Sequence, residues 1–162
     1  MDGIHKSIFL WGLISLIGYG AYHFFLFEPS FPQPLPLWSV LTVIGIAGML
    51  LWVPAWQKNK VVHTWLVVGV LGMLYHWAFA LEMVPAIIQS PWAYWALITA
   101  LGLFATGYFW TNKNMWYGLG VLHVGLFLVY YFAGMLVMPY ASALFAIASG
   151  VPLIYAGGVM KF

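Results

Sequence analysis

Residues 57–88 read QKNKVVHTWLVVGVLGMLYHWAFALEMVPAII, a short polar stretch with two lysines followed by a long apolar run. The run from 61 to 88 exceeds the roughly 20 residues that a helix needs to cross ~30 Å of hydrocarbon. Its acidic and basic side chains are His63, His76 and Glu82. The stretch therefore predicts a membrane-spanning helix that begins beside a basic loop.

The rest of the chain repeats this pattern. Of its 162 residues, 65% are hydrophobic and 5% are charged, and the mean hydropathy is +0.98. About a quarter of the residues of a water-soluble domain are charged, so this composition excludes that class of protein. We expect an all-α integral membrane protein, a single membrane domain over residues 1–162. Its six transmembrane helices are expected at roughly 5–27, 37–56, 61–88, 92–110, 115–138 and 140–160.

The positive charges predict how these helices are threaded. The chain has no arginine, and its five lysines are Lys6, Lys58, Lys60, Lys113 and Lys161. They flank the helices at every second connection, whereas the intervening connections carry prolines and no positive charge. Because lysines are retained on the cytoplasmic side of a membrane, both termini are predicted to be cytoplasmic, in the inner or plasma membrane.

An internal repeat is the second prediction about architecture. Each of Pro36, Pro91 and Pro139 is followed 22 residues later by a lysine, and Tyr22-His23 matches Tyr75-His76 in depth. We read three helical hairpins inserted in the same sense, at roughly 5–58, 59–113 and 114–162. Parallel repeats of this kind predict a pseudo-threefold arrangement about an axis along the membrane normal.

The ten tryptophans of this tryptophan-rich chain are predicted to form two belts at the membrane interfaces, where the indole N–H reaches water. The cytoplasmic belt would contain Trp11, Trp52, Trp56, Trp65, Trp110 and Trp116. The outer belt would contain Trp38, Trp77, Trp92 and Trp95.

Ionisable groups inside a membrane are costly and often functional, which makes His23 and His76 the first candidates. They lie 17 and 16 residues after Lys6 and Lys60, or ~25 Å along their helices. One histidine from each of two helices can hold a haem b iron, or supply nitrogen ligands to copper or zinc. A quinone site is a further reading. Glu28 and Glu82, five and six residues farther on, could add oxygen ligands or gate protons.

His123 lies ten residues after Lys113, near the predicted midplane, and is the candidate for a proton or solute path. The competing interpretation is that these histidines bond a neighbouring tyrosine or backbone carbonyl and serve packing alone. The chain has no cysteine, which excludes iron–sulfur clusters and Cys-attached haem. The absence of arginine removes the bidentate clamp for phosphate and carboxylate groups.

Three function classes stay open at this stage. We favour a small accessory or structural subunit of a larger membrane complex, such as a respiratory or redox complex, with no catalysis of its own. The alternatives are a transporter or channel for protons or an apolar solute, and a haem- or metal-binding redox protein using His23 and His76. The expected partners are the lipid bilayer and other membrane subunits or further copies of this chain. Nucleic acid is not among them, because the net charge of +2 is small.

Overall fold

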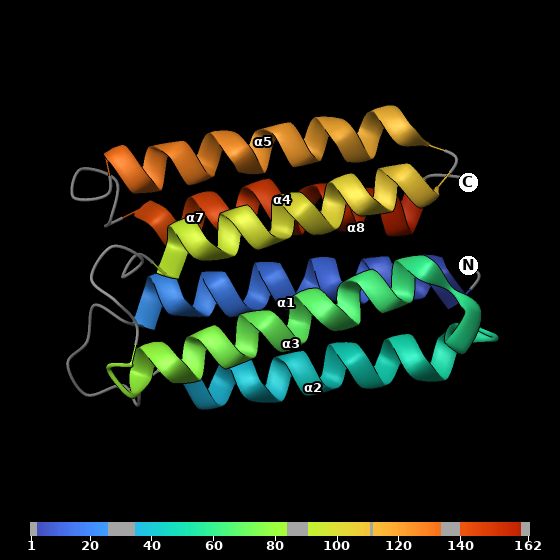
Figure 1. The fold of residues 1–162 in the computed structure, drawn as a ribbon, viewed down its shortest axis with the longest axis horizontal. Coiled ribbons are helices and arrows are strands. Elements are labelled where there is room, and N and C mark those ends of the chain that lie inside the picture. Colours follow the sequence, from blue (N-terminus) through green and yellow to red (C-terminus); the bar gives the residue numbers. More distant parts are fainter. Residues whose placement is uncertain (1–2, 26–34, 84–90, 111, 134–139, 160–162) are drawn as a thin grey trace. The chain divides into compact units, whose positions relative to one another are not determined.

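The computed structural model describes residues 3–25, 35–83, 91–110, 112–133 and 140–159, and this part of the chain is helices joined by turns (Figure 1). Five of its helical segments are long and apolar enough to cross a membrane, and α2 contributes a shorter apolar segment, Leu37–Trp52. The helices are α1 (Gly3–Phe25), α2 (Leu35–Trp52), the 3₁₀ turn η1 (Trp56–Lys58), α3 (Lys60–Ala80), α4 (Pro91–Phe109), α5 (Lys113–Phe132), α7 (Ala141–Phe145), the π-helical η4 (Ala146–Gly150) and α8 (Val151–Val159).

Two helices end earlier than the apolar runs predict. α2 ends at Trp52 instead of residue 56, because Pro54 disfavours helical backbone in the residue before it. Ala55 then adopts the left-handed conformation with φ 50°, which turns the chain. α3 ends at Ala80 instead of residue 88, and residues 84–90 lie outside the described part. Hydropathy alone does not mark these ends, since the residues beyond them are still apolar.

The chain divides into two compact units. The first comprises Met1–Trp56 and Pro139–Lys161, and thus α1, α2, α7, η4 and α8. The second comprises Gln57–Met138 with Phe162, and thus α3, α4 and α5. The two helices of the predicted third hairpin therefore belong to different units. The fifth helix, α5, packs on α4, whereas the sixth helix, which consists of α7, η4 and α8, packs on α1.

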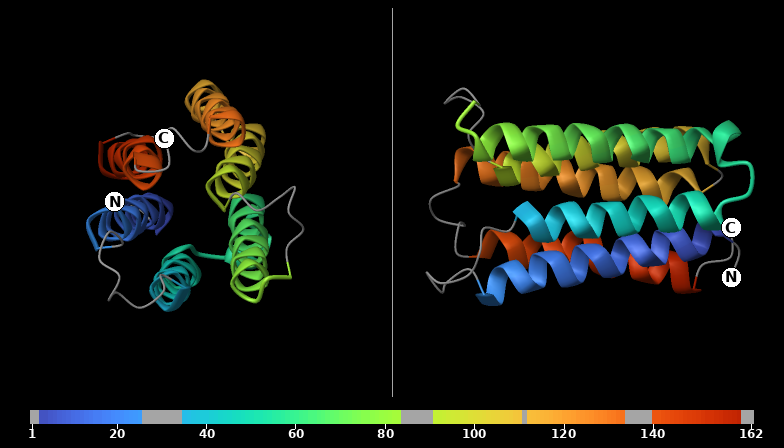
Figure 2. Two further views of the ribbon diagram at one scale, coloured as in Figure 1. Left: turned by 90° about the vertical axis from the view of Figure 1, so that its left-hand side faces the viewer. Right: turned by 90° about the horizontal axis from the view of Figure 1, so that it is seen from below.

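In the first unit, α1 runs antiparallel to α8, and the two lie side by side in the end-on view of Figure 2. Three glycines let the backbones approach closely. A Cβ on Gly12 would lie 2.6 Å from the Ile154 nitrogen, and one on Gly150 would lie 3.0 Å from the Leu16 nitrogen. Gly157 likewise faces the backbone of Phe9. Small residues at such crossings are how membrane helices associate without a hydrophobic driving force.

The sixth helix changes from α-helix to π-helix and back near its middle, and the position of Pro152 explains the place of this change. Proline has no N–H to donate to the carbonyl four residues earlier, and its ring clashes with that carbonyl. The turn of π-helix over Ala146–Gly150 directly precedes α8 and widens the backbone next to Pro152. This turn also places Gly150 against α1.

In the second unit, α4 lies between α3 and α5 (Figures 1 and 2). The N-terminus of α3 is capped by Asn59, whose side-chain oxygen accepts hydrogen bonds from the N–H groups of Val61 and Val62 at 3.0 and 3.2 Å. This cap ends the basic turn at Lys58 and begins the helix at Lys60, as asparagine commonly does.

Both units use one packing device, in which a tryptophan ring lies on a glycine of the neighbouring helix. In the first unit Trp11 lies on Gly45 and Trp38 lies on Gly18. In the second unit the same reciprocal contacts pair Trp65 with Gly102 and Trp95 with Gly72. Each of these four helices carries its tryptophan seven residues before its glycine. Seven residues are two helical turns, so the tryptophan and the glycine of one helix lie on the same face. We call such a glycine a socket, and two antiparallel neighbours form two of these contacts, each tryptophan filling the socket of the other helix.

For some tryptophans this packing differs from the predicted contact with lipid headgroups, and the two belts themselves stay a prediction. Trp38 and Trp116 are buried, with 7% and 1% of their surface exposed, instead of lying among lipid headgroups. The indole N–H groups of Trp65 and Trp95 donate to protein side chains. In a chain with few polar groups, large planar rings fill the space between helices, and this use outweighs interfacial anchoring for these residues.

Candidate functional site

His76 lies on α3 and is hydrogen-bonded across to α4. The Trp95 indole nitrogen lies 3.3 Å from His76 Nδ1. An indole N–H can only donate, so Nδ1 is the acceptor and the proton of the neutral imidazole is on Nε2. His76 is half-buried, and its side chain is thereby fixed in one orientation and one tautomer.

The surroundings of His76 hold this geometry in place. The Trp95 ring lies against Gly72, one turn before His76 on α3. The ring of Tyr75 is stacked on that of Tyr94, with a centroid distance of 3.7 Å and an interplanar angle of 9°. The Tyr94 hydroxyl donates to the Leu71 carbonyl at 3.1 Å. Two adjacent residues of α3 thus engage two adjacent residues of α4, which leaves the imidazole little freedom.

His23 lies in the last turn of α1, in the other unit. Its Nδ1 is 3.5 Å from Ser142 Oγ on α7. One turn earlier, the Tyr19 ring contacts Trp38 and Phe145, with centroid distances of 4.4 and 4.6 Å. His23 therefore lies above a buried aromatic cluster between α1, α2 and α7. Ligation of one ion by His23 and His76 together remains a prediction.

The hydrogen bond at His76 bears on the metal and haem hypothesis. A histidine that binds a metal uses a free nitrogen lone pair and donates its other N–H to a carboxylate or carbonyl. At His76 the Nδ1 lone pair accepts from Trp95, and Nε2 carries the proton, which is the reverse polarity. Within the described residues, no three histidine or acidic side chains come together in a way that could hold a metal ion.

Of the two candidate carboxylates, Glu28 and Glu82, the structure describes Glu82. Glu28 lies outside the described residues. Glu82 is exposed and follows α3 in a Schellman turn, where its N–H donates to Phe79 and the Met83 N–H donates to Ala78. Its φ is 57°, in the left-handed region where glycine is the usual residue. Sequence spacing continued the helix through this residue, whereas the structure makes it the helix-ending position.

We expect Glu82→Gly to stabilise the protein. Glycine has no Cβ and adopts the left-handed conformation without the roughly 1–2 kcal/mol cost of other residues. The substitution also removes a negative charge from the negative end of the α3 dipole. Thermal unfolding in detergent, followed by circular dichroism, should show a higher midpoint for the glycine variant than for Glu82→Ala. Equal midpoints would contradict a strained Glu82.

His123 is buried on α5, with 1% of its surface exposed. Its Nδ1 lies 2.8 Å from the Leu119 carbonyl, one turn earlier on the same helix. A carbonyl can only accept, so Nδ1 carries a proton and donates it within the helix. In the structure His123 forms a local hydrogen bond to the backbone of its own helix. A proton or solute path through this residue stays a prediction.

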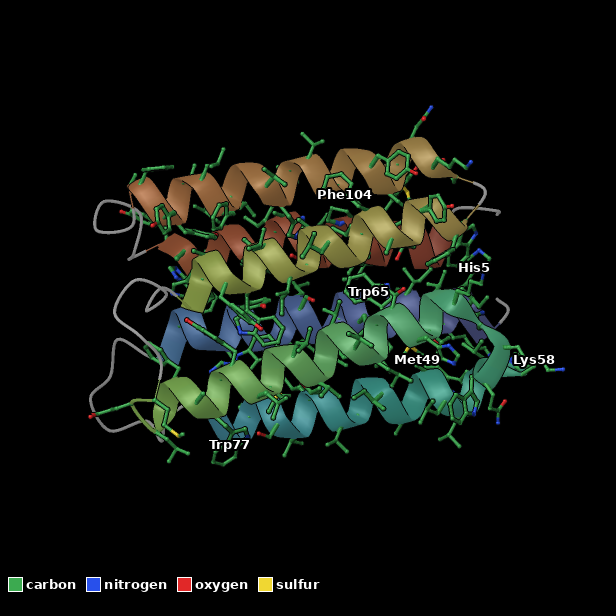
Figure 3. All side chains as sticks on the ribbon, in the orientation of Figure 1. His5, Met49, Lys58, Trp65, Trp77 and Phe104 are labelled. Carbon is green, nitrogen blue, oxygen red and sulfur yellow. The ribbon has the colours of Figure 1, made fainter. Side chains whose placement is uncertain are left out.

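A second polar contact between α3 and α4 was not predicted from the sequence. The Trp65 indole N–H donates to the Thr106 hydroxyl at 3.0 Å, and that hydroxyl donates to the Gly102 carbonyl at 2.8 Å. Trp65, labelled in Figure 3, lies on α3 five residues after Lys60, and Thr106 lies three residues before the end of α4. The tryptophan–glycine spacing of seven was the signal that could have found this contact and the one at His76.

The chain matches no known protein family, and no curated protein or solved structure is significantly similar to it.

Proposed function

We propose that this protein is a small multi-pass subunit of a larger membrane complex, with both termini cytoplasmic and its helices arranged as repeated hairpins. The lysine pattern supports the orientation. The antiparallel pairing of α1 with α8 also supports it, because the start of the first helix lies beside the end of the last, at Phe9 and Gly157. The reciprocal tryptophan–glycine contacts in both units support a repeat of the first two hairpins.

The observation that carries the subunit proposal is an open helix face on α5. Gly18 and Gly72 each lie twelve residues after a lysine, and each receives a tryptophan from a neighbouring helix. Gly125 lies twelve residues after Lys113, and a Cβ there would meet no atom within 4 Å. Gly125 is therefore the α5 position equivalent to the sockets Gly18 and Gly72, and no side chain of the described residues covers it.

The residues around Gly125 fit contact with another membrane helix. Gly118, two turns earlier on the same face, is also open. Between them Val121 and Leu122 are exposed, with 63% and 44% of their surface accessible. Small residues two turns apart, flanked by branched apolar side chains, allow a helix of another subunit to approach closely.

The local hydrogen bonds of the histidines favour this proposal over the two alternatives. His76 accepts from Trp95 and His123 donates to its own helix, which are the contacts of packing residues. Neither arrangement requires a bound metal or a transported ion.

Extraction of the native protein in a mild detergent, followed by size exclusion with full-spectrum absorbance, tests the proposal. We expect elution in an assembly well above the 18.2 kDa of the chain, with defined partner subunits at constant ratio. Elution as a small colourless particle would overturn the subunit proposal and bring flux assays in liposomes to the front.

The substitution Gly125→Leu sharpens this experiment. Because nothing lies near Gly125, leucine should leave the fold intact and remove the chain from the assembly by blocking close approach. Gly20→Leu is the matched control, since a Cβ at Gly20 also meets no atom within 4 Å. If both variants stay in the assembly, the α5 face is not the contact.

A further inference from the structure

The strongest remaining feature is the unused side of the His76 imidazole. With Nδ1 accepting from Trp95, Nε2–H is a hydrogen-bond donor. Within the part of the chain that the structure describes, Trp95 is the hydrogen-bond partner of His76, and the imidazole is partly exposed at the surface of the fold. Among the described residues of its unit, this donor therefore has no acceptor.

The position of His76 makes this costly. It lies 16 residues after Lys60, or ~24 Å along α3, inside the ~30 Å thickness of a hydrocarbon core. A donor without an acceptor costs several kcal/mol in hydrocarbon. The contact of Trp95 with Gly72 keeps the imidazole ring from turning away, so the acceptor must come from beyond the described residues of this unit.

We propose that His76 donates its Nε2–H to the carbonyl oxygen of a membrane-dissolved ligand. A carbonyl accepts from a neutral imidazole without any charge entering the membrane. Two membrane components carry this group and can reach the outer edge of the hydrocarbon core: the carbonyl of a quinone head group and the ester carbonyl of a phospholipid. The stacked Tyr75–Tyr94 pair beside His76 adds aromatic surface of the kind that a planar quinone ring packs against. This proposal is independent of the subunit proposal and needs no metal.

Nitrogen NMR of the ¹⁵N-histidine-labelled protein in nanodiscs separates the two sources. Diether phospholipids have no ester carbonyl, so they provide the reference state. A saturable shift of the His76 Nε2 signal on adding a decyl-tailed benzoquinone to diether nanodiscs would assign the site to a quinone. A shift on changing diether for diester lipid without quinone would assign it to the lipid ester. No change in either arm would overturn the proposal.

Variants keep the result interpretable. His76→Phe identifies the His76 signal and should weaken quinone binding about tenfold, the worth of one hydrogen bond. His76→Gln retains both an acceptor for Trp95 and an N–H donor, so it should retain part of the binding even if the phenylalanine variant folds poorly.

Trp95→Phe tests positioning, because the Nε2–H tautomer should no longer dominate and both nitrogen signals should move. Tyr94→Phe, which removes only the bond to Leu71, is the control that should leave the tautomer unchanged. A protonated Nδ1 in the unsubstituted protein would also overturn the proposal.

Discussion

The variant Gly72→Ala is expected to lose about 2–3 kcal/mol of stability, the upper range for overpacking a well-filled site. A Cβ at this position would lie within 2.9 Å of three carbon atoms of the Trp95 ring. The ring cannot swing aside without giving up its hydrogen bond to His76. The single added methyl group therefore forces α3 and α4 apart at this contact or breaks the bond.

The matched control is Gly125→Ala, at the corresponding position of α5. A methyl group there meets no atom within 4 Å, and alanine is the better helix former by about 1 kcal/mol. We expect unfolding of the purified chain in mixed micelles to show a loss for Gly72→Ala and none for Gly125→Ala. Equal effects of the two substitutions would mean that the tryptophan–glycine contact does not hold the helices together.

The second large effect is expected at the crossing of α1 and α8. A Cβ at Gly157 would meet the Phe9 nitrogen and lie 2.7 Å from the His5 carbonyl oxygen. Both are backbone atoms of a regular helix and cannot give way as a flexible side chain would. We expect Gly157→Ala to destabilise the first unit by about 2–3 kcal/mol, again as overpacking.

The next residue provides the control for this substitution. A Cβ at Gly158 would lie 3.6 Å from the Phe9 ring, an ordinary van der Waals contact. Gly158→Ala should therefore leave the thermal midpoint unchanged or raise it slightly, through helix propensity. A loss of stability in Gly158→Ala as large as in Gly157→Ala would contradict the close α1–α8 crossing.

The candidate site was only partly readable from the letters. Depth along each helix picked out His23, His76 and His123, because a rise of 1.5 Å per residue is independent of the neighbours. What His23 and His76 bond to was not readable, since their partners Ser142 and Trp95 lie on other helices, whereas His123 bonds the Leu119 carbonyl of its own helix. The polarity of the bond at His76, which disfavours metal ligation and makes Nε2 a donor, depends on that partner.

The tryptophans show where a general rule was overridden. A count of ten in a membrane chain predicts interfacial belts. Four of them, Trp11, Trp38, Trp65 and Trp95, each precede a glycine of their own helix by seven residues. The ring of each of these four lies on a glycine of the adjacent helix. The relevant signal was the spacing within each helix and not the distance from the nearest lysine.

The amino-acid sequence by itself determined that this chain is helical and apolar enough for several membrane crossings. Hydrophobic run length and the scarcity of charge act residue by residue, through the cost of exposing polar groups to hydrocarbon. Which helices pair was decided only by the tertiary structure. The helix faces here are largely apolar, so hydrophobicity does not distinguish a neighbouring helix from lipid, and the choice of neighbour depends on shape. Glycines opposite rings join α3 to α4, and glycines opposite backbone join α1 to α8. Such complementarity exists between two surfaces and cannot be read from either one alone.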